Sequence, residues 1–291
     1  WYLTSHYPDL FAGAAPFCGY CDYRLWEKPG GLTFHMHDWE EPSWKSRSAA
    51  YLIENFTHTP VWIVHREWDR GVGGGVPVEH SRQMARLLGD GGFEHRYTEV
   101  PETGHGCRKP EIFEEVVLWL LDQRKTRSPD HVRLKVYGLS HNSSYWAQIE
   151  QLGRYCEPGV VNGWLAGGLC EVATEGVRAL SLGPFDESCE LSIDGGGVGS
   201  LEATDRGTYV RKESCWALGA VAPKGKRHGC SGPIGDFFYD QTLLVPGTSG
   251  SKEASFFNEW AARDAASYYR SRNSGVHRGG IRGRTGWTFG S

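Results

Sequence analysis

The sequence predicts an α/β fold with a parallel sheet for residues 1–125, followed by a β-rich, sandwich-like region and a terminal α/β segment. Three observations lead to this prediction. Strand and helix patterns alternate up to residue 125, which is typical of a parallel sheet covered by helices. A charged, proline-containing linker follows at 124–130. Beyond it, short alternating segments are separated by glycine-rich turns, which is typical of a small β-sandwich.

The elements of the first region come in a regular order. We expect the end of a helix at 1–8, strands at 10–17, 59–65 and 93–100, and helices at 44–56, 78–88 and 110–120. The strand that Pro60 opens is rich in β-branched and aromatic residues, which favour strands. Pro110 begins the last helix, at a position where its missing N–H costs nothing.

The residues after 130 divide into two parts. Short strand patterns predict a β-rich domain over 130–200. They lie at 132–136, 145–149, 170–174, 177–182 and 189–193. Residues 201–291 are predicted to form a strand–helix extension, with a buried strand at 241–245 and an amphipathic helix from Lys252 to Arg272. Neither part carries a motif that assigns an activity.

Composition excludes two function classes. A net charge of −4 over 291 residues lacks the basic excess of nucleic-acid-binding proteins. No apolar run is as long as a membrane span. The sequence starts at Trp1 without an initiator Met or a signal peptide and ends in a Gly/Arg-rich tail, so we expect a piece of a longer polypeptide. The sequence determines neither the oligomeric state nor the localisation. A secreted or periplasmic setting is compatible with it.

Two loops carry the residues that indicate chemistry. Asp69 follows the strand at 59–65, and His105 follows the strand at 93–100. Functional groups of open α/β sheets collect at the carboxyl ends of the strands, so we expect the two side chains to meet. A carboxylate that orients an imidazole is the acid–base pair of serine hydrolysis. We therefore predict Asp69 and His105 as catalytic residues, with Glu67 as the rival acid.

The same loops resemble a known family. Four groups of residues match the H-G-x-x-D…V-P…S and later G-H pattern of the prolyl oligopeptidase catalytic domain: His65–Asp69, Val76-Pro77, Ser81 and Gly104-His105. Tyr7–Gly13 also resembles the stretch after the nucleophile helix of this family. The resemblance covers about residues 1–125. It implies the C-terminal part of an α/β-hydrolase fold and a peptidase or esterase that cleaves peptide or acyl-ester substrates through an acyl-enzyme. Asp69 is then the triad acid and His105 the triad base, and no cofactor is expected.

Two departures from the family pattern limit this inference. Arg66 stands where the family has glycine, and Gly71–Gly75 enlarges the loop behind the acid. No G-x-S-x-G nucleophile elbow occurs in the sequence. The serines within 229–232 and 247–250 lie outside such a motif and follow the triad base, which is the wrong chain order. We therefore expect the nucleophile upstream of the printed residues and little activity in these residues alone.

Two places in the sequence combine residue types that can bind a metal. His35, His37 and Asp38 combine an H-x-H spacing with a carboxylate, but a polar rim of the substrate cleft is the preferred interpretation. Cys18 and Cys21 have the C-x-x-C spacing of zinc and redox sites. Because a second C-x-x-C is missing, we interpret them as structural and predict no metal.

The alternative function is a non-catalytic binding protein. In that hypothesis the β-rich region 130–200 contacts a polymer or a partner, and the hydrolase part is a degenerate scaffold. The upstream coding sequence discriminates the two hypotheses, because a G-x-S-x-G there favours the enzyme and a replaced serine favours the scaffold.

Overall fold

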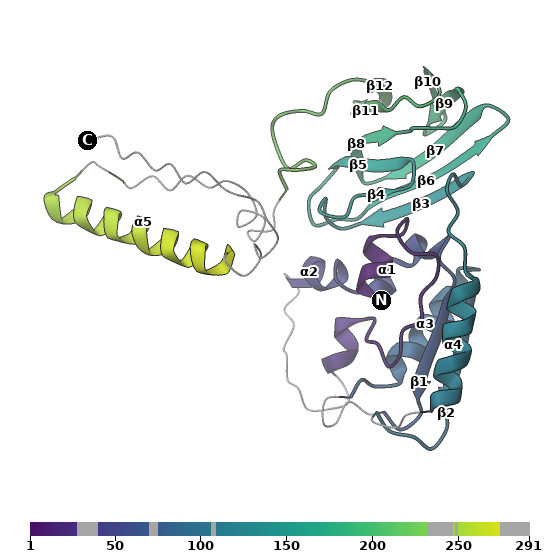
Figure 1. The fold of residues 1–291 in the computed structure, drawn as a ribbon. Coiled ribbons are helices and arrows are strands. Elements are labelled where there is room, and N and C mark those ends of the chain that lie inside the picture. The colour runs from purple at the N-terminus through teal and green to yellow at the C-terminus, as the bar shows by residue number, and fades with distance from the viewer. Residues whose placement is uncertain (28–39, 70–74, 106–108, 232–246, 248–249, 274–291) are drawn as a thin grey trace. The chain divides into compact units, whose positions relative to one another are not determined.

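The computed structural model describes residues 1–27, 40–69, 75–105, 109–231, 247 and 250–273 (Figure 1). The chain divides into two compact units, Trp1–Ser231 and Gly232–Ser291. The hypothetical metal ligands at 35–38, most of the 71–75 loop and the predicted strand at 241–245 lie outside the described residues. None of the helices in the described ranges is both long and apolar enough to cross a bilayer.

The predicted fold class is wrong. The described part of the chain is mostly β-sheet, and its parallel sheet has only two strands, β1 (Val61–Arg66) and β2 (His95–Val100). The predicted strand at 10–17 contributes only isolated parallel bridges, from Ala14 and Phe17 to β1. The broad parallel sheet of an α/β-hydrolase is therefore not seen in these residues.

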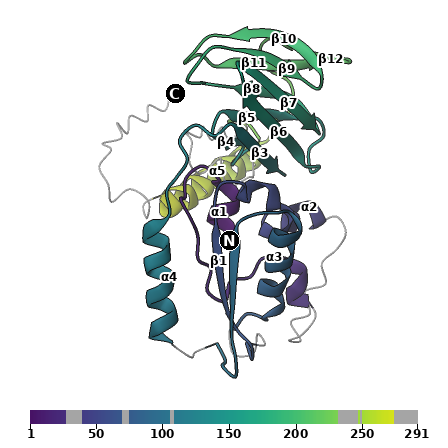
Figure 2. The ribbon, with the colours of Figure 1, turned by 90° about the vertical axis from the view of Figure 1, so that its right-hand side faces the viewer.

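The number of β–α–β units explains the discrepancy. The pair β1 and β2 is joined by α3 (Glu79–Asp90), and α4 (Pro110–Asp122) covers the other face of the pair (Figure 2). Ile63 packs with Met84 of α3, whereas its neighbour Val64 packs with Val116 of α4, because successive side chains of a strand alternate between faces. Each further parallel strand requires its own crossover connection, and among the described residues before β1 only the segment 14–17 runs parallel to β1, through isolated bridges.

The helices before β1 are short. They are α1 (Tyr2–His6), the 3-10 helix η1 (Tyr23–Glu27), α2 (Glu41–Lys45), and the 3-10 helices η3 (Ala49–Tyr51) and η4 (Ile53–Phe56). The helix predicted at 44–56 is thus broken into three pieces. Serine hydroxyls at the break form other hydrogen bonds: Ser46 Oγ donates to Ser43 O, and Ser48 Oγ accepts from Tyr23 N. Such bonds compete with a continuous helix.

Two five-stranded sheets follow, in the orders β10-β9-β7-β6-β3 and β12-β11-β8-β5-β4. The strands are β3 (His131–Val136), β4 (Ser143–Ser144), β5 (Ala147–Leu152), β6 (Gly159–Ala166), β7 (Leu169–Glu175), β8 (Val177–Leu182), β9 (Cys189–Ile193), β10 (Gly196–Leu201), β11 (Gly207–Lys212) and β12 (Cys215–Leu218). All neighbouring strands are antiparallel except β7 and β9. Buried residues of both sheets, such as Leu134 and Ile149, form one apolar core, so the sheets pack face to face. The strands continue past residue 200.

Asn55 joins η4 to the edge strand β3. Its Nδ2 donates to Ser5 O (2.7 Å) and Lys135 O (2.9 Å), and its Oδ1 accepts from Lys135 N (2.7 Å). The side chain therefore pairs with β3 as the backbone of a neighbouring strand would. Because Asn55 is buried, these bonds fix the segment before β1 on the β-rich part of the same unit.

The second unit contains α5 (Lys252–Asn273), where the sequence predicts a helix from Lys252 to Arg272. Asn258 Nδ2 donates to Gly247 O (3.1 Å) within this unit. The aromatic side chains Phe256, Phe257 and Trp260 are exposed, although the amphipathic pattern predicts that one face of the helix is covered.

Candidate active site

The loops that follow β1 and β2 are held together by backbone hydrogen bonds. Glu67 N donates to Val100 O (3.1 Å), and Trp68 N donates to Thr103 O (3.0 Å). Because β1 and β2 are parallel neighbours, both chains leave the sheet at the same edge. The two predicted catalytic residues are carried by these loops.

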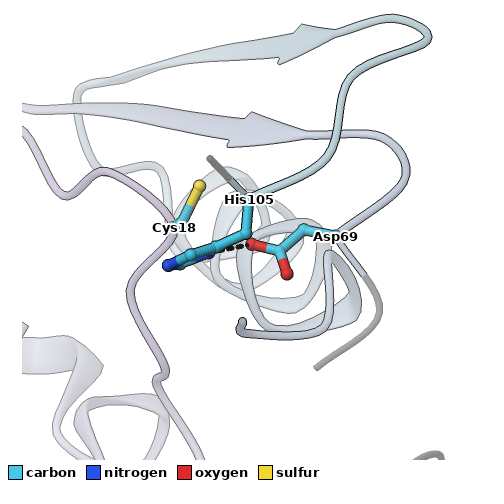
Figure 3. Close-up of side chains that lie close together, drawn as sticks. All are labelled: Cys18, Asp69 and His105. Carbon is cyan, nitrogen blue, oxygen red and sulfur yellow. Dashed lines mark hydrogen bonds and ion pairs between the residues drawn. The ribbon is translucent and has the colours of Figure 1, made fainter. Parts of the chain in front are cut away.

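Asp69 and His105 form a hydrogen-bonded pair at this edge (Figure 3). His105 Nδ1 lies 2.6 Å from Asp69 Oδ2. An ionised carboxylate only accepts hydrogen bonds, so Nδ1 carries the proton and Nε2 presents a lone pair. The Asp69 side chain is 1% exposed and that of His105 is 48% exposed. The buried acid therefore orients an imidazole that solvent and a substrate can reach.

Glu67, the rival acid, has a different partner. Its Oε2 accepts a hydrogen bond from Glu102 N (2.9 Å). Glu102 has a left-handed backbone, with φ of 54°, a conformation that is unfavourable for most residues. The Glu67 carboxylate thus stabilises the turn that precedes His105, and it is Asp69 that contacts the imidazole.

His65 supports the loop behind Asp69. The ring is completely buried, with Nε2 2.8 Å from Val76 O and Nδ1 2.6 Å from Ser81 Oγ. A carbonyl only accepts, so Nε2 donates to Val76 and Nδ1 accepts from the Ser81 hydroxyl. Burial lowers the pKa of His65, which keeps the ring neutral near pH 7. His65 therefore connects Val76 to Ser81, and its Nε2 lies 3.6 Å from Asp69 Oδ2.

Cys18 is the residue of this site that the sequence analysis missed. It follows the bridge between Phe17 and Val64, and its Sγ lies within 4.8 Å of a carboxylate oxygen of Asp69 and a ring nitrogen of His105 (Figure 3). Burial raises the pKa of the Cys18 thiol, and the charge of Asp69 raises this pKa further. The rule that placed the other two residues at strand ends could have found Cys18, because it follows the predicted strand at 10–17.

Cys21 has separate partners, although it shares a C-x-x-C spacing with Cys18. Its backbone N–H donates to His80 Nδ1 (3.2 Å), and its Sγ donates to His80 O (3.1 Å). Burial raises the pKa of this thiol strongly. Both cysteines are free thiols, as are the other described cysteines; Cys107 lies outside the described residues.

Comparisons with known proteins give partial matches. No protein-family model matches the chain. Over 111 residues it is 34% identical to an "uncharacterized secreted protein" of Arthroderma benhamiae, a match that covers 36% of this chain and 11% of that protein. The chain thus spans about a tenth of the length of this relative. A solved structure of a puromycin-hydrolysing peptidase of Mycobacterium tuberculosis is 20% identical over 36% of this chain and 17% of that chain, with a TM-score of 0.28.

Proposed function

We propose that this chain is part of a serine hydrolase, a peptidase or esterase of the prolyl oligopeptidase type, in which Asp69 is the triad acid and His105 the triad base. The observation that carries the proposal is the 2.6 Å contact between His105 Nδ1 and Asp69 Oδ2. It combines a buried carboxylate with a half-exposed imidazole, which is the arrangement that a general base for a hydroxyl nucleophile needs.

The pair performs the proton transfers of acyl transfer. His105 Nε2 takes the proton of the serine hydroxyl as its oxygen attacks the substrate carbonyl, and then gives that proton to the leaving group. Asp69 stabilises the imidazolium that forms between these steps. Water then attacks the acyl-enzyme with His105 again as the base, which releases the acid product and restores the serine. No G-x-S-x-G occurs in the printed sequence, so the serine belongs to a longer polypeptide.

The substrate class and setting follow from the same proposal. The motif around Asp69 and His105 supports peptide or acyl-ester substrates, because it resembles that of the prolyl oligopeptidase family. The relative from Arthroderma benhamiae is called a secreted protein, which supports an extracellular setting for this hydrolase. The acid–base pair lies within residues 1–125, the first of the predicted parts.

The test uses the longer polypeptide that contains these residues. A fluorophosphonate probe should label one serine upstream of Trp1, and His105→Ala should abolish the labelling. Asp69→Asn should slow it by about 10⁴-fold, because the imidazole adopts the wrong tautomer. Glu67→Gln, a carboxylate change in the same loop, and His95→Ala, on a neighbouring element, should keep near-normal rates. An unlabelled parent protein would favour the non-catalytic binding protein instead, whereas labelling that survives in His105→Ala would reject His105 as the triad base.

A further inference from the structure

Three possible metal ligands meet beside β1. Cys18, Asp69 and His105 offer a sulfur, a carboxylate oxygen and an imidazole nitrogen that all lie within 4.8 Å of one another (Figure 3). In the part of the chain that the structure describes, no other group of three such side chains is found. We propose that these residues bind a divalent transition-metal ion of the zinc type, and that the metal-bound cluster and the hydrogen-bonded pair are alternative states of one site.

The spacing of the three atoms is close to that of a tetrahedral centre. Zinc–ligand distances of 2.0–2.3 Å place two ligand atoms about 3.5 Å apart. The separations here are at most 4.8 Å, so no pair of atoms must approach by more than about 1.3 Å (4.8 − 3.5). The His105 side chain is half-exposed and can rotate toward the ion, whereas Asp69 is buried.

The donor set selects the class of metal. A thiolate and an imidazole favour zinc, cobalt and related ions, whereas magnesium and calcium prefer oxygen ligands alone. On binding, the Cys18 thiol releases its proton to solvent and its sulfur bonds to the ion. The hydrogen bond between His105 and Asp69 breaks, and the Nδ1 proton passes through solvent to Nε2, so that Nδ1 provides a neutral lone pair. The thiolate and the Asp69 carboxylate then balance the two positive charges. The exposed side of His105 leaves a fourth position for water, as in zinc sites with three protein ligands.

A nucleophilic role for Cys18 is a weaker interpretation. A cysteine nucleophile is activated by a neighbouring base or by a lowered pKa, whereas burial and the charge of Asp69 raise the pKa of the Cys18 thiol. The Cys18 backbone is left-handed, with φ of 48°, a conformation that is unfavourable for residues other than glycine. In this conformation the sulfur lies close to a carboxylate oxygen of Asp69 and a ring nitrogen of His105. All three atoms can then bind one cation.

Cobalt binding to the 291-residue chain tests the proposal directly. After chelator treatment, titration with Co²⁺ should give one tight site per chain, a thiolate-to-cobalt charge-transfer band and the visible bands of a tetrahedral ion. Zn²⁺ should displace the cobalt. Cys18→Ser should remove the charge-transfer band and weaken binding by more than the roughly 10- to 100-fold that loss of an outer-shell partner costs. His105→Ala and Asp69→Asn should weaken binding to a similar extent.

Matched variants separate this site from other thiols and histidines. Cys156→Ser removes an exposed thiol, Cys107→Ser removes the cysteine closest in sequence to His105, and His95→Ala removes a histidine of β2. All three should keep the band and the affinity. A band that persists in Cys18→Ser, or that disappears in Cys107→Ser, would overturn the proposal. If circular dichroism shows that Cys18→Ser does not fold, His105→Gln replaces it. Unchanged affinity for Co²⁺ in His105→Gln would then overturn the proposal.

The proposal does not depend on hydrolase activity. Metal binding is measured on the printed chain, whereas probe labelling is measured on the longer protein with its serine. A chain that binds cobalt through Cys18 while the parent protein stays unlabelled would keep the metal site and reject the hydrolase. The reverse result would reject the metal site alone.

Discussion

Gly75 lies against the carboxylate of Asp69 so closely that a Cβ atom at position 75 would be 2.2 Å from Asp69 Oδ1. Carbon and oxygen cannot approach to that distance without a shift of one group. The same Cβ would be 3.3 Å from the Cβ of His105. Glycine at this position therefore leaves room for the carboxylate of Asp69 while Asp69 keeps its contact with the imidazole.

Gly75→Ala should consequently move Asp69 away from His105. Misplacement of a catalytic group by about 1 Å costs about 100-fold in rate, so we expect fluorophosphonate labelling of the longer protein to slow by that factor. Gly138→Ala is the matched control, because a Cβ there meets no atom within 4 Å. Equal labelling rates for the two variants would contradict the contact between Gly75 and Asp69.

The positions of Asp69 and His105 could be predicted because the rule behind them is local. Each residue follows a strand, and two parallel neighbouring strands end at the same edge. The extent of the sheet could not be predicted in this way. Alternating patterns identify strands but do not indicate how many strands pair in one sheet. The segment at 10–17 forms only isolated bridges to β1. Pro16 lies between the two bridged residues and has no N–H to donate to a ladder.

Cys18 was missed for a different physical reason. Its spacing from Cys21 suggested that both cysteines share one role, and a structural role was assigned to both. In the structure the left-handed backbone at Cys18 separates the two: Cys21 bonds to His80, and Cys18 Sγ lies within 4.8 Å of a carboxylate oxygen of Asp69. The sign of φ at a single residue is set by tertiary packing, so the spacing of the cysteines could not indicate it.

Asn55→Ala should destabilise the unit formed by Trp1–Ser231. The substitution removes three hydrogen bonds and leaves the buried Ser5 O and the partly buried N and O of Lys135 without this partner. Each unpaired buried group costs about 1–3 kcal/mol, so we expect a loss of about 3 kcal/mol in the free energy of unfolding. Urea denaturation followed by tryptophan fluorescence measures it. Asn258→Ala, in α5, should leave this transition unchanged.

Acid should destabilise the same unit through His80. Burial, with a smaller contribution from the charge of His65, lowers the pKa of His80 to about 4. The unfolded chain binds a proton at this histidine near pH 6.5, whereas the folded chain does so only near pH 4. The contribution of the neutral ring to stability is therefore complete above pH 6.5 and is lost as the pH falls toward 4.

The size of the effect follows from that difference in pKa. A difference between about 6.5 and 4 corresponds to about 3 kcal/mol at the acidic end of the window. His80→Gln, which keeps a hydrogen-bond acceptor for Cys21 N, should reduce the slope of unfolding free energy against pH between 6.5 and 4. The buried His65, whose pKa is also lowered, should maintain a residual slope. An unchanged slope in His80→Gln would refute the assignment.

The left-handed backbone at Cys18 predicts an unusual order of stability for two variants. Cys18→Gly and Cys18→Ala both remove the thiol, so their difference reports the backbone alone. Because an L-residue costs about 1–2 kcal/mol in this conformation and glycine does not, Cys18→Gly should be the more stable by about 1 kcal/mol. Cys215, in β12, provides the control, because glycine weakens a strand and Cys215→Gly should be less stable than Cys215→Ala. Urea denaturation in the presence of a chelator measures both pairs, and the same order at both positions would exclude a left-handed Cys18.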